Sequence, residues 1–323
     1  MNRKLLLIAR VGVAALLIVW LFRRSGGLAP VWNAFRSARP ALVVAAFLAT
    51  LAVQALIAHR LQRLTAAGGA TLGTREVLAI NLTTLFYGLF LPGGGVTAIA
   101  IRYFRLTRGD RRYAATLVAI VCDRVLATAA LCVTGLGFWL FDPGASRAGL
   151  AVLLVAAAAS FATLAPMFGA APARRLGAIA ARIPFARDLW PRVDEALAMC
   201  RALPSRGRLE VGTLSAVAHV LGAAVYLLLA RSLAIATPFA ALGWMRALSG
   251  LVTLVPISVS GLGLREGTMT ALLAARGVPH AAAFAYSLLV FGITVLATGL
   301  IGGLIEASQW FGARAEPDPR PGA

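Results

Sequence analysis

Long apolar runs fill this chain from Leu5 almost to Glu306, and they constrain its fold more than any other feature. A helix needs about 20 predominantly apolar residues to cross a bilayer. Several runs have this length and few charges, which predicts an all-α integral membrane protein, a polytopic bundle of helices. The six clear spans are predicted at 5–22, 41–58, 114–141, 148–169, 211–230 and 281–306.

The composition points to the same class. Of the 323 residues, 60% are hydrophobic and 13% are charged, and the mean hydropathy is +0.83. Soluble domains are roughly half apolar and a quarter charged. A soluble enzyme, a disordered chain and a fibrous repeat are therefore excluded. Residues 5–22 follow two basic residues as a signal peptide does, but Arg10 interrupts the run and no small-residue cleavage site follows, so we expect an uncleaved first span.

The charge balance is strongly basic, with 31 Lys and Arg against 12 Asp and Glu, a net charge of +19. In a soluble protein this would suggest nucleic acid as a partner, but no nucleic-acid-binding motif is present. Basic loops on the cytoplasmic side of a membrane explain it instead. With both termini placed inside, most loop arginines fall on the cytoplasmic side, which predicts a multi-pass protein of the cell inner membrane. The four arginines of the first outside loop, Arg23, Arg24, Arg36 and Arg39, oppose this bias.

Two further apolar stretches, 77–106 and 238–275, are each broken near the middle by Pro and Gly. Such breaks are tolerated at membrane depth only where the freed backbone lines a cavity or is buried in protein. Each half of the chain, 1–141 and 148–306, then contains two spans, a broken segment and a last span. This order predicts one transmembrane domain over 1–306, built as an inverted repeat with a site between the broken segments. Whether these segments are re-entrant or cross fully stays open at this point.

The second break has the sequence PISVSGLGLREG at 256–267. Its glycines allow close approach of a ligand, and the helix that restarts at Leu264 presents free N–H groups to an anion. Arg265 adds a permanent charge suited to phosphate. The alternative is a kinked packing helix whose Arg265 pairs with an acid on a neighbour; we favour function because a kink needs only one Pro or Gly. The residues predicted to bind a lipid headgroup here are Pro256, Ser258, Gly261, Gly263 and Arg265.

The first break, LPGGG at 91–95, has the same features in weaker form. Pro92, Gly93, Gly94 and Gly95 precede a helix that carries Arg102 two turns in. The glycines are not a P-loop, because no Gly-Lys-Ser/Thr follows. We predict that these five residues complete the headgroup site.

Asp123 and Arg124 lie near the middle of a predicted span, where ionisable groups are rare and usually functional. Adjacent residues on a helix point in different directions, so each needs a partner of its own. We expect these partners to be Arg102, Arg265 or Glu266, with Asp123, Arg124 and Glu266 balancing charge and gating. A purely structural buried ion network is an equally weighted alternative.

The stretch 172–210 is predicted to be a basic cytoplasmic loop. Within it we expect an interfacial helix capped by Asp188, with Pro191 in its first turn, in preference to a specific lipid-binding platform. The Pro-rich tail 307–323 is expected to be disordered.

Residues suited to catalysis or metal binding do not cluster in the sequence. The histidines at 59, 219 and 280 lie far apart, so no metal or other cofactor is expected, and His219 is interpreted as a packed, hydrogen-bonded histidine. Gly299 and Gly303 are spaced for close helix packing. We do not expect an enzyme.

These broken segments, together with the Asp123-Arg124 pair, resemble one family. It is the flippase-like transmembrane region of lysylphosphatidylglycerol synthases, whose stand-alone relatives include proteins linked to hopanoid, glycolipid or dolichol-sugar handling. The resemblance covers nearly the whole chain, and its most specific part is the pattern P-x-S followed by G-x-G-x-R-E-G in the second break. It implies the lipid-translocating half of such a synthase without the soluble aminoacyl-transfer domain.

The chain departs from the family pattern in its first half. The family often has an acid between the glycines and the following arginine, whereas residues 96–101 have none. It also usually has Glu where Asp123 stands, and often another acid where Ala127 stands. The resemblance therefore leaves the lipid substrate open.

The leading hypothesis is a flippase-like protein that translocates or handles an anionic or glycosylated lipid, such as a phospholipid, a polyprenyl-linked lipid or a hopanoid. The alternatives are an intramembrane lipid-modifying transferase and a non-transporting subunit that docks a separate lipid-synthesising enzyme.

Overall fold

The computed structural model describes residues 19–21, 23–91, 95–108, 113–142, 144–254 and 263–315, and these residues form helices joined by turns, without a strand. Five helical segments are long and apolar enough to cross a membrane. A 28-residue helix is about 42 Å long, which exceeds the roughly 30 Å of the hydrocarbon core. The five segments are α3 (Pro40–Ala67), α6 (Tyr113–Leu140), α7 (Arg147–Phe168), α10 (Ser205–Ser232) and His280–Trp310.

The prediction of an all-α polytopic membrane bundle is confirmed. Each predicted span after the first coincides with one of these helical segments. The last span is continuous through α13 (His280–Phe291), the π-helix η1 (Gly292–Ala297) and α14 (Thr298–Ala315). The predicted span 5–22 falls almost entirely outside the described residues.

Both broken stretches form pairs of short helices. The first pair is α4 (Thr74–Phe90) and α5 (Gly95–Leu106), and the second is α11 (Phe239–Val252) and α12 (Leu264–Ala274). Within each pair the two helices contact one another. The longest of the four, α4, spans about 26 Å and the others about 16 to 21 Å, so none reaches across a 30 Å core. Their lengths therefore suit re-entrant hairpins better than full spans.

The end of α4 follows from the sequence of the break. Leu91 caps α4 with extended backbone angles, φ −92° and ψ 146°. The residue before a proline is disfavoured in the helical region, and Pro92 comes next. The helix therefore stops where LPGGG begins.

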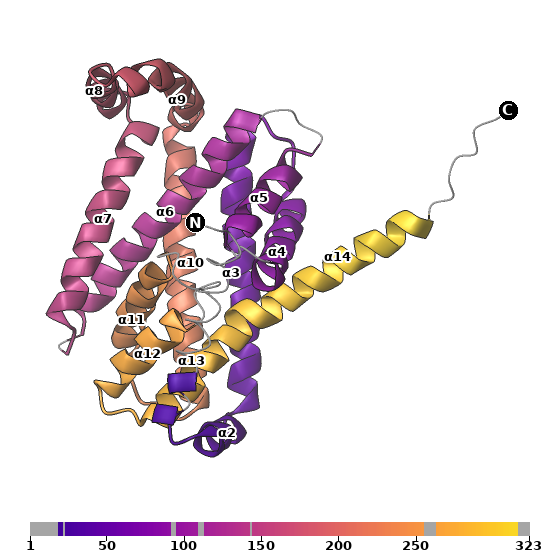
Figure 1. Ribbon diagram of the computed structural model, residues 1–323, viewed down its shortest axis with the longest axis vertical. Helices are drawn as coiled ribbons and strands as arrows, with labels where there is room; N and C mark the ends of the chain where they lie inside the picture. Colours follow the sequence, from indigo (N-terminus) through magenta and orange to yellow (C-terminus); the bar gives the residue numbers. More distant parts are fainter. Residues whose placement is uncertain are drawn as a thin grey trace.

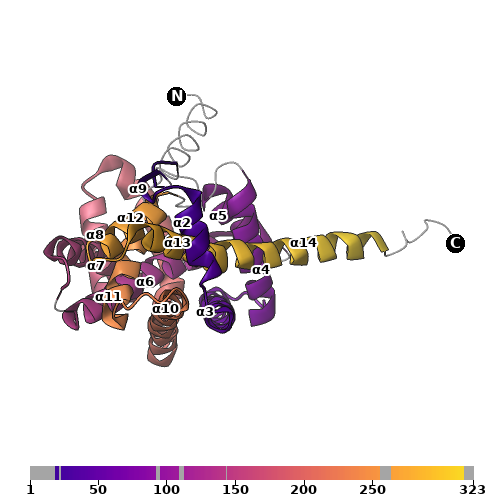
Figure 2. The same ribbon diagram turned by 90° about the horizontal axis from the view of Figure 1, so that it is seen from below.

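The helices assemble into an elongated bundle (Figure 1). Helices α8 (Ala170–Ala180) and α9 (Pro184–Ala202) lie together at one end, called here the α8–α9 end. The short helix α2 (Leu28–Arg36) lies at the opposite end, the α2 end. Helices α3 and α10 pack side by side along the bundle. Seen from below, α6, α7, α11 and α12 lie to one side of this pair, and α4, α5 and α14 lie to the other (Figure 2).

Three glycines allow α14 to approach α4 closely. A Cβ atom at Gly302 would lie 2.0 Å from the Leu82 carbonyl oxygen, and one at Gly299 or Gly303 would lie 2.7 Å from the side chain of Leu89 or Phe86, respectively. The predicted packing role of Gly299 and Gly303 is confirmed, and Gly302 makes the tightest contact.

The start of α9 and the end of α14 differ from the prediction. Helix α9 begins at Pro184, so Pro191 lies inside it and Asp188 is not its cap. Pro184 itself supplies the start, because a proline in the first turn costs no hydrogen bond. Helix α14 continues to Ala315, whereas disorder was expected from 307, because nothing in SQWFGARA breaks a helix before Pro317.

Candidate functional site

The arginine of the second break is neutralised by its own neighbour. Arg265 donates from Nε and Nη2 to Oε1 of Glu266, at 3.0 and 2.8 Å. The other oxygen of Glu266 accepts the N–H of Gly263 at 2.7 Å and so caps α12. Gly263 has φ +87°, a left-handed conformation that favours glycine. The Glu266 carboxylate, which is fully buried, therefore occupies the helix N-terminus at which an anion was expected.

Asp123 pairs with Arg60, which lies two residues beyond the predicted span 41–58. Its Oδ1 lies 2.7 Å from Nε of Arg60, and Nη1 of Arg60 donates to Ser215 Oγ at 3.0 Å. Both charged side chains are almost completely buried. Asp123 thus pairs with none of the expected partners. Arg60 was missed because the second span was ended at residue 58, whereas α3 runs on to Ala67 without a helix-breaking residue.

Arg102, two turns into α5, lacks such a partner. Its Nε atom is buried and makes no hydrogen bond. The charges acting on it are Asp123, which attracts it, and Arg124 and Arg60, which repel it. Because Arg60 already neutralises Asp123, the interior around Arg102 carries an excess of positive charge. Arg124 is exposed and forms no ion pair with a described residue.

Buried polar atoms without a hydrogen-bond partner lie on the helices that flank the breaks. Native interiors leave few such atoms, and water, an ion or a ligand usually explains them. In the described part of the chain they occur on one residue of each of the four short helices that flank the two breaks. The four residues are Asn81 on α4, Arg102 on α5, Ser249 on α11 and Thr270 on α12.

A second arginine without a carboxylate lies on α11. Arg246 Nη1 is 3.2 Å from Nδ1 of His219, and Nε2 of His219 lies 2.8 Å from the Ala127 carbonyl. Because guanidinium only donates and a carbonyl only accepts, His219 carries its proton on Nε2 and is neutral. The interpretation of His219 as a packed, hydrogen-bonded histidine is confirmed, but its bond to Arg246 was not foreseen.

The bundle's other buried or half-buried carboxylates are occupied in the same way. Besides Asp123 and Glu266, each of the four that remain in the described residues has an arginine of its own. Among the residues the structure describes, Arg102 and Arg246 are therefore left as interior cations without a carboxylate. The four further pairs are Asp142–Arg276, Glu306–Arg105, Asp194–Arg201 and Glu210–Arg63.

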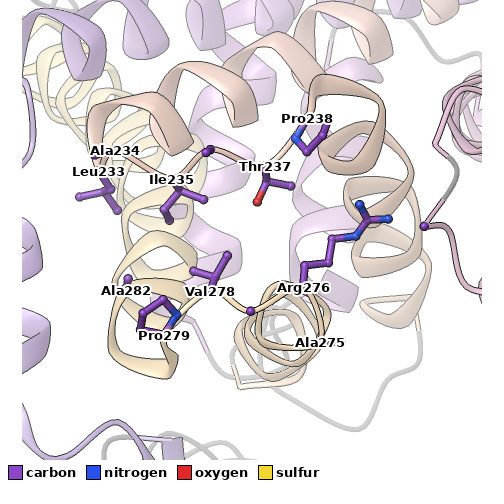
Figure 3. A pocket seen from close by; sticks show the side chains of 13 residues that line it. Leu233, Ala234, Ile235, Thr237, Pro238, Ala275, Arg276, Val278, Pro279 and Ala282 are labelled. Carbon is purple, nitrogen blue, oxygen red and sulfur yellow. The ribbon is translucent and has the colours of Figure 1, made fainter.

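A pocket of about 810 Å³ opens at the α2 end, between the loops 233–238 and 275–279 (Figure 3). At its edge Arg276 binds Asp142, which also accepts the indole N–H of Trp244 at 2.6 Å. Burial alone would raise the pKa of Asp142, but the hydrogen bonds from Trp244 and Arg276 bring it below its ordinary value. This network joins the loop after α6 to the loop after α12.

Several predicted site residues lie outside the described residues, and two others lie at helix starts. Gly95 is the first residue of α5, and Gly263 precedes α12. The predicted residues outside the description are Pro92, Gly93, Gly94, Pro256, Ser258 and Gly261.

Comparison with known proteins gives a single assignment. No curated protein matches the chain significantly. No solved structure matches it significantly. The family model described as the lysylphosphatidylglycerol synthase TM region matches residues 7–302, which is most of the chain. The protein therefore belongs to the lysylphosphatidylglycerol synthase TM region family, whose role is lipid-related, and it is a multi-pass membrane protein.

Proposed function

We propose that this protein carries the headgroup of an anionic or glycosylated lipid between the leaflets of a bacterial-type inner membrane, with both of its own termini on the cytoplasmic side. The observation that carries the proposal is the set of unpartnered buried polar atoms, one residue on each helix beside the two breaks. A polar headgroup passing between these helices would supply the missing hydrogen bonds.

The charge of the interior selects the headgroup. Arg102 is a permanent cation with no carboxylate of its own, and an unpaired arginine at the membrane centre costs about 2.5–3.5 kcal/mol on insertion scales. A phosphate that binds Arg102 offsets this cost and accepts its planar N–H groups in pairs. The neighbouring Arg124 adds to the positive field.

The arginines that are paired with carboxylates fix the positions of the helices around the proposed headgroup path. Arg60 and Asp123 join α3 to α6, and Ser215 adds α10 to the same cluster. Arg265 and Glu266 fix the start of α12 and leave little charge for a ligand. In this proposal Arg102 contacts the phosphate directly, and Arg265 acts by positioning α12.

The experiment is a leaflet-accessibility assay in proteoliposomes with labelled phosphatidylglycerol and, separately, a polyprenyl-phosphate sugar. Arg102→Gln is compared with Arg108→Gln, which removes the same charge at an exposed position just beyond α5. We expect wild type and Arg108→Gln to transfer one of the lipids, and folded Arg102→Gln to do so at least ten times more slowly. Transfer at the wild-type rate by folded Arg102→Gln would overturn the proposal. Transfer of neither lipid by wild type would favour a docking subunit or an enzyme instead.

A further inference from the structure

The unpaired Arg246 faces a cavity separate from the orphaned atoms around the breaks. The cavity measures about 180 Å³ and lies between α3, α10, α11 and the π-helix η1. Its lining combines apolar residues with the following polar ones: Thr50, Gln54, Tyr226, Arg246 and Thr294.

The guanidinium of Arg246 is held in place from three sides. His219 accepts one N–H, and the ring of Tyr226 lies 5.7 Å from the guanidinium carbon. On the third side is Gly222, where a Cβ atom would lie 2.5 Å from Nη2 and 2.8 Å from the guanidinium carbon. Only glycine at 222 leaves room for this position of the arginine. The other N–H groups of Arg246 have no hydrogen-bond partner among the described residues.

A second donor lines the same cavity without a partner. Gln54 is half-buried, and no hydrogen bond joins its amide to a described residue. The hydroxyl groups of Thr50 and Thr294 donate to helix carbonyls at 2.8 and 2.7 Å, so they do not compete for Arg246. The cavity therefore presents N–H donors and one uncompensated positive charge.

The π-helix contributes to the shape of this cavity. Thr294 lies in η1, the one described segment with π-helical hydrogen bonding. Such widened turns interrupt the regular helix and occur frequently at functional sites. Phe291, which immediately precedes η1, lies 5.0 Å from the guanidinium carbon of Arg265. The last residue of α13 thus contacts the arginine at the start of α12, and the π-helix that follows it lines the Arg246 cavity.

Charge and size together indicate the kind of ligand. A planar arginine with several free N–H groups is suited to a phosphate. Pockets that enclose a drug-sized molecule measure about 300–1,000 Å³, so this cavity admits a headgroup but no acyl chain. Leu48 on α3 and Leu296 on η1, each two positions from a lining threonine, are exposed and apolar, so the chains of a lipid can remain outside.

We propose that the cavity formed by Arg246, Gln54, Tyr226 and Thr294 is a phosphate-binding site that receives a phosphorylated lipid headgroup. This site deepens the proposed function, because it gives the headgroup a second binding site along its path. Only the site's role in transfer rests on the proposed function. Binding itself is a separate claim. The same donors would also hold a free phosphate ester, so the two sources need separate measurements.

The test measures binding by the full-length protein, independently of transfer. One arm uses nanodiscs of phosphatidylcholine that contain increasing phosphatidylglycerol. The other arm titrates glycerol phosphate into the detergent-solubilised protein. The variants are Arg246→Gln, which removes the charge, and Gly222→Ala, whose methyl group displaces the guanidinium. Gly212→Ala on the same helix has no atom within 4 Å of the added methyl group, and Arg231→Gln removes an exposed charge, so both serve as controls.

We expect phosphatidylglycerol to bind the wild type and both controls, and Arg246→Gln and Gly222→Ala to weaken its binding at least tenfold. If Arg246→Gln does not fold, lipid binding is measured instead with Gly222→Ala and with Arg246→Lys, which keeps the charge. Equal binding by the wild type and Gly222→Ala or Arg246→Gln would overturn the site. Binding of glycerol phosphate but not of the lipid would overturn the lipid as its ligand.

The outcomes also separate this inference from the proposed function. Binding that depends on Arg246 in a protein that transfers no lipid would leave the site standing and remove the transfer role. If the wild type transfers lipid but its binding does not depend on Arg246, the site is overturned and the proposed transfer function stands.

Discussion

The two broken segments differ in whether their arginine has a carboxylate partner. In α12 the acid follows the arginine directly, and Glu266 both caps the helix and neutralises Arg265. In α5 no acid lies between Gly95 and Arg102, and the carboxylate that attracts Arg102, Asp123, is already paired with Arg60. The comparison separates two uses of a buried arginine. A paired one stabilises the backbone around it, whereas an unpaired one is, under the function proposed above, left for a ligand.

The largest difference between paired and unpaired arginines should appear in the free energy of unfolding. We expect Asp123→Asn to lower the free energy of unfolding by about 3–5 kcal/mol, because it leaves Arg60 buried without its partner. Arg102→Gln should leave the stability unchanged or raise it, because it removes a cation that has no partner. Thermal unfolding in detergent measures both. If the two variants unfold alike, the distinction between paired and unpaired arginines fails.

The comparison can be sharpened by making α12 resemble α5. Glu266→Gln keeps a cap for the Gly263 N–H but frees Arg265, and we expect it to lower stability by about 1.5–3 kcal/mol, as for a charged hydrogen bond. It should also strengthen phosphatidylglycerol binding, because Arg265 then joins Arg102 and Arg246 as an interior arginine without a carboxylate. Equilibrium binding in nanodiscs checks this, with Glu76→Gln, the cap residue of α4, as the matched control. Weaker lipid binding by Glu266→Gln would contradict the neutralising role of Glu266.

A smaller effect is expected at the α2 end, where Asp142 and Arg276 are paired. Because the folded protein lowers the pKa of Asp142, this pair stabilises the fold above the ordinary carboxyl pKa of about 3.9 and loses its effect as the pH falls through the lower folded value. Arg276→Gln should therefore be less stable than the wild type at pH 7, by about 1 kcal/mol, and the difference should shrink below pH 4. Melting temperatures at both pH values test it; a difference that grows in acid would be incompatible with this pair.

Much of the fold could be predicted because it depends on local apolar patterns. The spans after residue 40, the two breaks and the glycine packing of α14 all follow from runs of residues close in sequence. The partners of the buried charges could not be predicted. Arg60 and Asp123 are 63 positions apart, and Arg246 and His219 are 27 apart, so their pairing depends on how the helices pack. One signal was available for Arg60, since nothing after residue 58 would end the helix before Gly68.

The same limit applies to the candidate site. In the sequence, Arg102 and Arg265 were given the same role because each follows a glycine-rich break, with the first break showing these features in weaker form. Glu266 was visible beside Arg265, but an adjacent acid on a helix normally points elsewhere, and only the structure places its carboxylate against the guanidinium.

The most direct test of an uncompensated charge at position 102 compares lipid transfer by Arg102→Lys and Arg102→Gln in the same proteoliposomes. Lysine keeps the positive charge and loses the planar donor geometry, whereas glutamine loses the charge. We expect Arg102→Lys to transfer the lipid at a reduced but measurable rate, and Arg102→Gln at least ten times more slowly than the wild type. Equal rates for the two folded variants would contradict the claim that the charge of Arg102 binds the headgroup.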